Sequence, residues 1–264
     1  FGTLDKAVDQ GAHCQGKHLL IGNGYHDAQY ERDAINLLIN NGCEAIVVHS
    51  KALDDSELIA LSEEVPGLVL INRYIPELAH RCIYLDNQKG SYLITEYLIK
   101  NGHQQIAYIC SDHNIDDATQ RKMGFMDALQ KSQLTCPDEY FEYAQPNEKG
   151  GEQAMKRLLA KGLPITAVVA YNDSMAAGAL SYMFDNNINV PQDMSLVGFD
   201  DALIAQYIRP KLTTMSYPIQ IMAEQATHLA LALAKKEKIE QGNDLAFIPK
   251  LISRDSVAAL ITTK

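Results

Sequence analysis

The chain has 264 residues, of which 47% are apolar and 21% charged, a balance typical of an ordinary globular protein. Its formal net charge of −10 argues against direct contact between this stretch and nucleic-acid phosphates. No run approaches the roughly 18 to 20 apolar residues that a membrane span requires. The composition therefore excludes a membrane-spanning helix, and if the protein handles DNA, another segment makes the contact.

Short β-rich runs alternate with longer stretches of helical spacing along the chain. The runs are His18–Gly22, Glu44–His49, Gly67–Asn72, Ile106–Cys110, Ala167–Tyr171, Ser195–Asp200 and a final one at Phe247–Arg254. Helices are expected between them, among others at Ala28–Asn41, Gly90–Asn101, Glu152–Lys161 and Ile219–Lys236. Runs such as Glu44–His49 are continuously apolar at their centres, as in strands whose two faces are covered by helices. The pattern predicts a doubly wound, parallel α/β fold.

The length suits two smaller sheets better than one open sheet of eight or nine strands. Polar stretches without clear periodicity interrupt the alternation near residues 111–117 and 209–218. We therefore expect a first lobe made of residues 1–110 and 218–246, and a second made of residues 111–217 and 247–264. The chain would then cross between the lobes three times.

Polar residues follow most of the predicted strands. In open α/β sheets, ligands bind beyond the carboxyl ends of the strands. The residues at these places are Asn23, Tyr25, His49, Ser50, Asn72, Arg73, Asn172, Asp173, Asp200 and Asp201. Helix capping favours the same residue types, but the whole set indicates a site that pairs with the hydroxyl groups of a neutral sugar. Two adjacent carboxylates at a strand end point apart, so Asp201 is expected to contribute little to sugar affinity.

The sequence gives little support for an enzyme active site, a cofactor site or a metal site. The run from Gly22 to Asp27 begins like a dinucleotide-binding fingerprint, but Asp27 replaces the third glycine. Phosphate-loop, zinc-protease and nucleophile-elbow motifs are absent from the sequence. Ser174 has no adjacent base, and His103 is expected to be structural. We expect no enzymatic activity, no cofactor and no metal. The five cysteines lack any CxxC pairing, which indicates reduced thiols and a cytoplasmic protein.

Several motifs, in the same order across essentially the whole chain, resemble the effector domain of the LacI–GalR family of bacterial repressors. They are residues 101–106 (NGHQQI), 121–125 (RKMGF), 171–179 (YNDSMAAGA), 195–201 (SLVGFDD) and 212–214 (LTT). The galactose-responsive members are the most similar, through residues 20–26 (LIGNGYH), 47–51 (VVHSK), 150–155 (GGEQAM) and the Arg209-Pro210 pair.

The resemblance implies a periplasmic-binding-protein-like type I fold and a homodimer. It also implies a helix-turn-helix headpiece that binds operator DNA. The headpiece and the first strand of the family lie outside this sequence, in which residues 1–4 match the start of the family's first helix. Matched residue by residue, the expected ligand-binding positions are Arg121, Asn172, Asp200, Asn72, Tyr217 and Phe1. One departure is Gln145, where the lactose-responsive relative has a tryptophan.

The resulting hypothesis is the sugar-sensing domain of a repressor, with D-galactose as the first candidate ligand. Sugar binding between the lobes would change the affinity of the dimer for its operator, provided the sugar binds the released state more tightly. An exported sugar-binding protein of the same fold is the alternative. A dinucleotide-dependent or nucleotide-sugar enzyme is a third reading, supported only by the imperfect glycine run.

Overall fold

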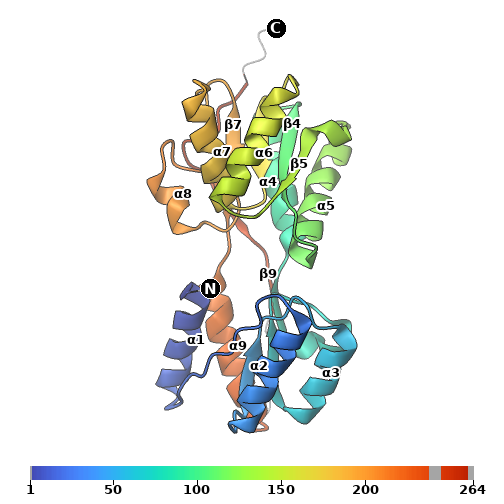
Figure 1. The fold of residues 1–264 in the computed structure, drawn as a ribbon, viewed down its shortest axis with the longest axis vertical. Helices are drawn as coiled ribbons and strands as arrows, with labels where there is room; N and C mark the ends of the chain where they lie inside the picture. The colour runs from blue at the N-terminus through green and yellow to red at the C-terminus, as the bar shows by residue number, and fades with distance from the viewer. Residues whose placement is uncertain (1, 238–244, 261–264) are drawn as a thin grey trace. The chain divides into compact units, whose positions relative to one another are not determined.

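The computed structural model describes residues 2–237 and 245–260 of the chain (Figure 1), which divides into two compact units. The first unit extends to Leu85 and includes Pro218–Phe247; the second comprises Asp86–Tyr217 and the segment from Ile248 onward. The chain thus passes from one unit to the other three times, at residues 85/86, 217/218 and 247/248.

The first boundary differs from the one predicted at residue 110. Residues 86–110 belong to the second unit because the strand that ends this stretch, β4 (Ile106–Ser111), pairs there with the strands on both sides of it. The preceding helix, α4 (Asn87–Lys100), packs against α5 (Asp116–Lys131). The boundary is therefore placed at Leu85.

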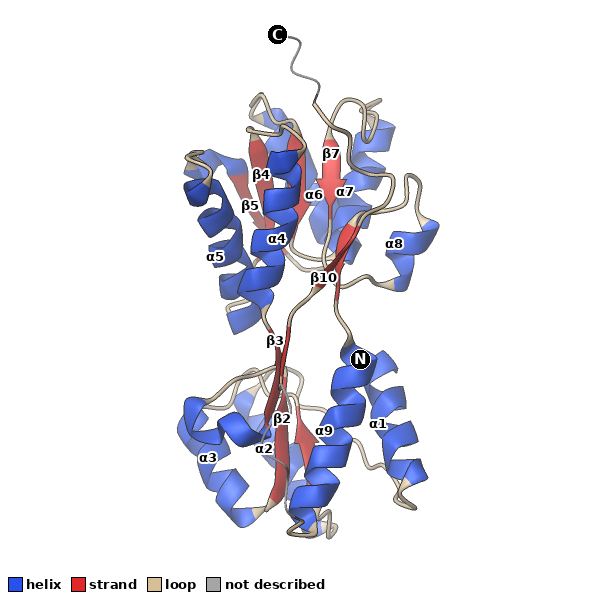
Figure 2. Cartoon of the chain, turned by 180° about the vertical axis from the view of Figure 1, so that it is seen from behind, coloured by secondary structure: helices blue, strands red, loops and turns tan. Residues whose placement is uncertain are grey.

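The first unit is a parallel sheet of order β1-β2-β3-β9 with helices on both faces. Helices α1 and α9 pack together on one face, and α2 and α3 lie on the other (Figures 1 and 2). All five residues of β2 are buried, as expected for a continuously apolar central strand. Its elements are β1 (Ala45–Val48), β2 (Gly67–Ile71), β3 (Cys82–Leu85), β9 (Ala246–Phe247), α1 (Gly2–Cys14), α2 (Ala28–Asn40), α3 (Asp55–Glu64), α9 (Ile219–Ala234) and a 3-10 turn at Pro76–Arg81.

The strand predicted at His18–Gly22 is wrong for this structure, in which the segment has no regular secondary structure. A strand needs a hydrogen-bonding partner, but within the described part of the chain a cavity of about 850 Å³ separates residues 17–24 from β1. Helices α1 and α9 complete the lining of this cavity. Leu20 and Ile21 remain 54% and 65% exposed.

The second unit is a parallel sheet of order β5-β4-β6-β7, with α4 and α5 on one face and α6 and α7 on the other (Figure 2). Strands β8 and β10 form a separate antiparallel pair. The remaining elements of this unit are β5 (Phe141–Ala144), β6 (Ala167–Ala170), β7 (Ser195–Val197), β8 (Thr214–Ser216), β10 (Lys250–Ile252), α6 (Glu148–Ala160), α7 (Asp173–Asp185), α8 (Leu203–Tyr207) and a 3-10 turn at Asp138–Tyr140. The predicted doubly wound α/β architecture is confirmed in both units.

Candidate functional site

Arg121 is the centre of the polar cluster beyond the carboxyl ends of the strands in the second unit. Helix α5 carries it, and the residue is 3% exposed. Each of its guanidinium nitrogens donates a hydrogen bond to a different acceptor: Nε to Asn87 Oδ1 (2.8 Å), Nη1 to the carbonyl of Tyr171 (2.7 Å) and Nη2 to Asp200 Oδ1 (3.1 Å). The guanidinium is therefore fixed in both position and plane.

Two aromatic rings stack against this guanidinium. Its central carbon lies 3.7 Å from the ring centroid of Phe199 and 4.7 Å from that of Tyr171. Burial alone would lower the pKa of Arg121, but the carboxylate of Asp200 and further neighbouring groups raise it above its ordinary value. Arg121 is thus a permanent cation held by aromatic and carboxylate groups.

The carboxylate of Asp200 is bound to Arg121 through one of its two oxygens. Its Oδ1 accepts the bond from Arg121, whereas Oδ2 accepts no hydrogen bond from any residue that the structure describes. The side chain is 32% exposed. An ionised carboxylate accepts several hydrogen bonds, so Oδ2 has the chemistry and the access to receive the hydroxyl groups of a ligand while Arg121 fixes the other oxygen.

Tyr217 lies next to this pair in the same unit. Its backbone N–H donates to the carbonyl of Asp200 (3.2 Å). Burial, together with the negative charges of Asp117 and Asp200, raises the pKa of the Tyr217 hydroxyl, which therefore stays protonated and able to donate at neutral pH. The structure thus brings three of the predicted residues, Arg121, Asp200 and Tyr217, into one cluster.

Asn172 has a structural role in this arrangement. It is the N-cap of α7: its Oδ1 accepts from the N–H of Met175 (2.8 Å), and its Nδ2 donates to the carbonyl of Pro146 (3.1 Å). A capping role, the alternative interpretation of such residues, accounts for both ends of this amide. The second hydrogen of Nδ2 is the group that a ligand could use, and contact between Asn172 and a ligand stays a prediction.

The polar residues predicted in the first unit bond to other groups of the same unit. Asn72 follows β2 with a φ of +56°, is 8% exposed, and its N–H donates to Ile83. Ser50 donates to Glu31 (2.5 Å), and Arg73 pairs with Asp55 (2.6 Å). Asn72 belongs to the first unit and the cluster around Arg121 to the second, so contact between Asn72 and a ligand stays a prediction. Phe1, the sixth predicted position, lies outside the described residues.

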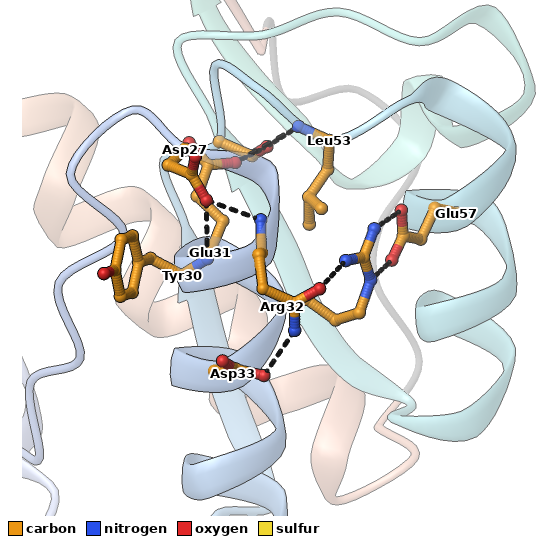
Figure 3. Close-up of polar contacts among 9 residues, drawn as sticks. Asp27, Tyr30, Glu31, Arg32, Asp33, Leu53 and Glu57 are labelled. Atoms are coloured by element: carbon orange, nitrogen blue, oxygen red, sulfur yellow. Dashed lines mark hydrogen bonds and ion pairs between the residues drawn. The ribbon is translucent and has the colours of Figure 1, made fainter.

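Glu31 organises the loop that follows β1. Figure 3 shows its carboxylate beside Leu53, whose N–H donates to it at 3.2 Å. The N–H groups of Lys51 and Ala52 donate to the same carboxylate. Figure 3 also shows Asp27 accepting from the first turn of α2, so the residue that breaks the dinucleotide fingerprint is a helix cap. Arg32 of α2 pairs with Glu57 of α3 beside it.

Sequence reasoning missed several residues that contact Arg121. Asn87 lies just after β3, a strand that the sequence analysis did not predict. Phe199 lies inside the motif at residues 195–201, but its contact with a cation is visible only in three dimensions. Asp117, in the first turn of α5, is 8% exposed and lies in the polar stretch that appeared to be a boundary.

His103 and Ser174, which were considered for catalytic roles in the sequence analysis, both bond to structural partners. His103 is 1% exposed and is bonded through Nδ1 to Thr166 (3.1 Å) and through Nε2 to the carbonyl of Ala258 (3.0 Å). Burial lowers its pKa. Ser174 donates to Glu148 (2.8 Å). Gln145, at the departure from the lactose-responsive pattern, donates to Asp112 (3.1 Å) and bonds His113 (3.2 Å).

Comparison with known proteins identifies the family of this chain. A family model described as a periplasmic binding protein-like domain matches residues 95–257. The transcriptional regulator GalR of Escherichia coli is 49% identical, over 98% of this chain and 75% of its own length. GalS of Salmonella typhimurium is 47% identical, over 98% of this chain and 76% of its own length. The chain therefore spans about three quarters of the relatives that it matches.

Solved structures agree with this placement. A sugar-binding transcriptional regulator of the LacI family from Escherichia coli, complexed with phosphate, has a TM-score of 0.90 and 27% identity, over 98% of this chain and 93% of that one. The Escherichia coli repressor AscG has the same TM-score and identity, over 98% and 94%. These relatives are transcription regulators rather than exported binding proteins or enzymes. The chain belongs to the LacI–GalR family of transcription regulators and corresponds to their effector-sensing domain.

Proposed function

We propose that this domain senses a neutral monosaccharide, D-galactose first, and that the sugar binds against Asp200, Arg121 and Phe199 in the second unit. The observation that carries the proposal is the partly exposed carboxylate of Asp200, whose Oδ1 accepts a hydrogen bond from a buried arginine that stacks on an aromatic ring. A carboxylate of this kind accepts bonds from vicinal hydroxyls, and an apolar ring can pack against the sugar. Galactose is favoured because GalR and GalS are among the most similar relatives.

Sugar binding is proposed to regulate operator binding by a headpiece outside this chain. The relatives are of the helix-turn-helix type, and a quarter of their length lies outside the match. A sugar can release the operator only if it binds the released conformation more tightly than the operator-bound one. The acidic charge of this stretch, −10 in all, agrees with a division in which it senses and another part binds DNA.

A homodimer is part of the proposal. Large apolar side chains stand exposed on helices of both units: Leu37 at 57% on α2, Phe184 at 79% on α7, and Tyr207 at 72% on α8. Large exposed apolar side chains of this kind are candidates for contact with a second copy of the chain, and two-fold dimers are the commonest assembly. None of the helices that the structure describes has the length and apolar character of a membrane span. On the separate ground of its similarity to GalR and GalS, we propose a cytoplasmic location for the protein.

We further propose that the domain binds its ligand without chemical change. The cluster offers one cation and its partner carboxylates, and the weighed nucleophile and base, Ser174 and His103, are engaged in structural bonds. Calorimetric titration of D-galactose, D-fucose, glucose, lactose and ribose tests the whole proposal. D-Galactose should bind most tightly and be recovered unchanged. Tighter binding of a purine or a sugar phosphate than of every neutral sugar would overturn the ligand class.

A further inference from the structure

We propose that Asp173 and Arg254 are positioning residues, which hold Asp200 in the orientation that receives the sugar. The inference rests on the proposed function, because Asp200 is the sugar acceptor in it. Neither residue reaches the ligand in our assignment: Asp173 is fully buried, and the guanidinium of Arg254 bonds to Asp201 and to a backbone carbonyl. Both act on the short turn that carries Asp200.

The backbone of this turn is in an unfavourable conformation that needs support from neighbouring residues. Asp200 has a φ of +106° and Asp201 a φ of +53°, two consecutive non-glycine residues in a region that L side chains rarely adopt. Such conformations persist only where the surrounding structure imposes them, and they gather at binding sites. The groups that impose this turn therefore determine where the carboxylate of Asp200 points.

Asp173 bonds to the turn on both of its sides. Its backbone N–H donates to the carbonyl of Phe199 (2.9 Å), just before Asp200. Its Oδ2 accepts from the N–H of Ala202 (2.7 Å), just after Asp201. One residue at the start of α7 thus spans both strained residues, and Oδ1 is fixed in turn by the hydroxyl of Thr214 (2.6 Å).

Gly198 makes room for this carboxylate. A Cβ at position 198 would lie only 2.2 Å from Asp173 Oδ1, far inside contact distance. Any side chain at residue 198 would therefore push Asp173 away from the turn. Gly198 therefore allows the buried Asp173 to stay in contact with the turn that carries Asp200.

Arg254 holds the turn from the C-terminal segment. Its Nη2 pairs with Asp201 Oδ1 (2.5 Å), and its Nη1 donates to the carbonyl of Leu212 (2.8 Å). Its backbone N–H donates to Thr213 Oγ1 (2.9 Å). The two carboxylates of the turn are thus drawn to two different arginines, Asp201 to Arg254 and Asp200 to Arg121. The proposal therefore differs from the expectation drawn from the sequence, that Asp201 contributes little to sugar affinity, and titration of Asp201→Asn decides between the two.

The test compares Arg254→Met with a matched control, Arg157→Met. Arg157 also bridges a carboxylate, Glu142 (2.5 Å), and a backbone carbonyl, that of Tyr143 (2.7 Å), in the same unit, but away from the turn. Titrated with D-galactose, Arg254→Met should bind at least about tenfold more weakly than the wild type, whereas Arg157→Met should bind as the wild type does. Because Arg254 acts through Asp200, the double variant with Asp200→Asn should bind within about threefold of Asp200→Asn alone.

Wild-type affinity in Arg254→Met, or a loss that adds in full to that of Asp200→Asn, would overturn the inference. If Arg254→Met does not fold, Asp201→Asn removes the same pairing from the other side and is subject to the same comparison. A second readout needs no sugar. Nuclear magnetic resonance should show the guanidinium hydrogens of Arg121 exchanging faster with water in Arg254→Met than in Arg157→Met, and equal rates would refute the positioning role. If the wild type binds no sugar, the proposed function fails, while this second readout still decides the inference.

Discussion

Replacement of Arg121 by lysine tests the proposed site most directly. The guanidinium bonds to three acceptors in one plane, Asn87, the carbonyl of Tyr171 and Asp200, and stacks on Phe199. A lysine ammonium is a point charge that cannot reproduce this planar fork. Arg121→Lys should therefore weaken D-galactose binding nearly as much as Arg121→Ala.

The expected loss follows from the bonds at stake. A charged hydrogen bond removed from a buried site, with its partner left unpaired, costs about 2–4 kcal/mol, which corresponds to roughly 30- to 1,000-fold in affinity. Asp200→Asn should cost less, about tenfold, because the amide oxygen still accepts one bond. In the full-length protein these variants should still bind operator but no longer release it when sugar is added.

Calorimetric titration and thermal melting, measured side by side, are the assays, with Arg157→Lys as the control for an arginine paired away from the site. Sugar affinity within threefold of the wild type in a folded Arg121→Lys protein would refute the reasoning. A lower melting temperature with unchanged sugar affinity in Asp200→Asn would show that Asp200 serves the fold alone.

Three further predictions concern stability, dynamics and assembly. Burial, together with the charge of Asp200, raises the pKa of Asp173 to about 8, from an ordinary 3.8. Its contribution to folding stability is therefore fully present below about pH 4 and is lost as the pH rises toward 8. Melting curves between pH 4 and 9 should show a steeper loss for the wild type than for Asp173→Asn, and parallel curves would contradict this. Backbone amides of Leu19–Ile21 should exchange with deuterium much faster than those of β2, because nothing described pairs with them; equal protection would show that the segment is a paired strand. Sedimentation should show a dimer that Tyr207→Glu weakens, and a monomer at high micromolar concentration would refute it.

The alternation of apolar runs was sufficient to predict the doubly wound fold, because strands buried on both faces are continuously apolar. It was not sufficient for the boundary at Leu85. Strand β3 was not predicted from the sequence, and its successor β4 pairs with strands later in the chain. The same short strand hid Asn87, which follows it and accepts from Arg121. Both discrepancies have one cause, which is that pairing partners are a tertiary property.

The segment His18–Gly22 is the opposite case: a strand was predicted there, but none forms. Its β propensity is real, but propensity is a weak preference beside hydrogen bonding. With a cavity between it and β1, the backbone has no ladder to join. A local pattern can therefore indicate which residues suit a strand without deciding whether one forms.

Within the candidate site, the sequence predicted which residue types follow the strands, but it did not show whether each one caps a helix or binds a ligand. Asn172 and Asp200 both follow strands and both suit either capping or binding. The structure separates them by their partners: the amide of Asn172 bonds to Met175 and Pro146, whereas the side chain of Asp200 bonds to Arg121 through one oxygen and is 32% exposed. Such a distinction depends on atoms that converge from distant parts of the chain.

The turn at Asp200 and Asp201 makes the same point at the scale of two residues. Adjacent carboxylates would repel each other and compete for one cation if they pointed together. Positive φ values at both residues allow them to diverge, one toward Arg121 and the other toward Arg254. The strain of that backbone is held by Asp173, which fits only because residue 198 lacks a side chain. The motif that contains Gly198, Asp200 and Asp201 therefore acts as one geometric unit in our proposal, in which Asp200 receives the sugar while Gly198 and Asp201 help to hold it in place.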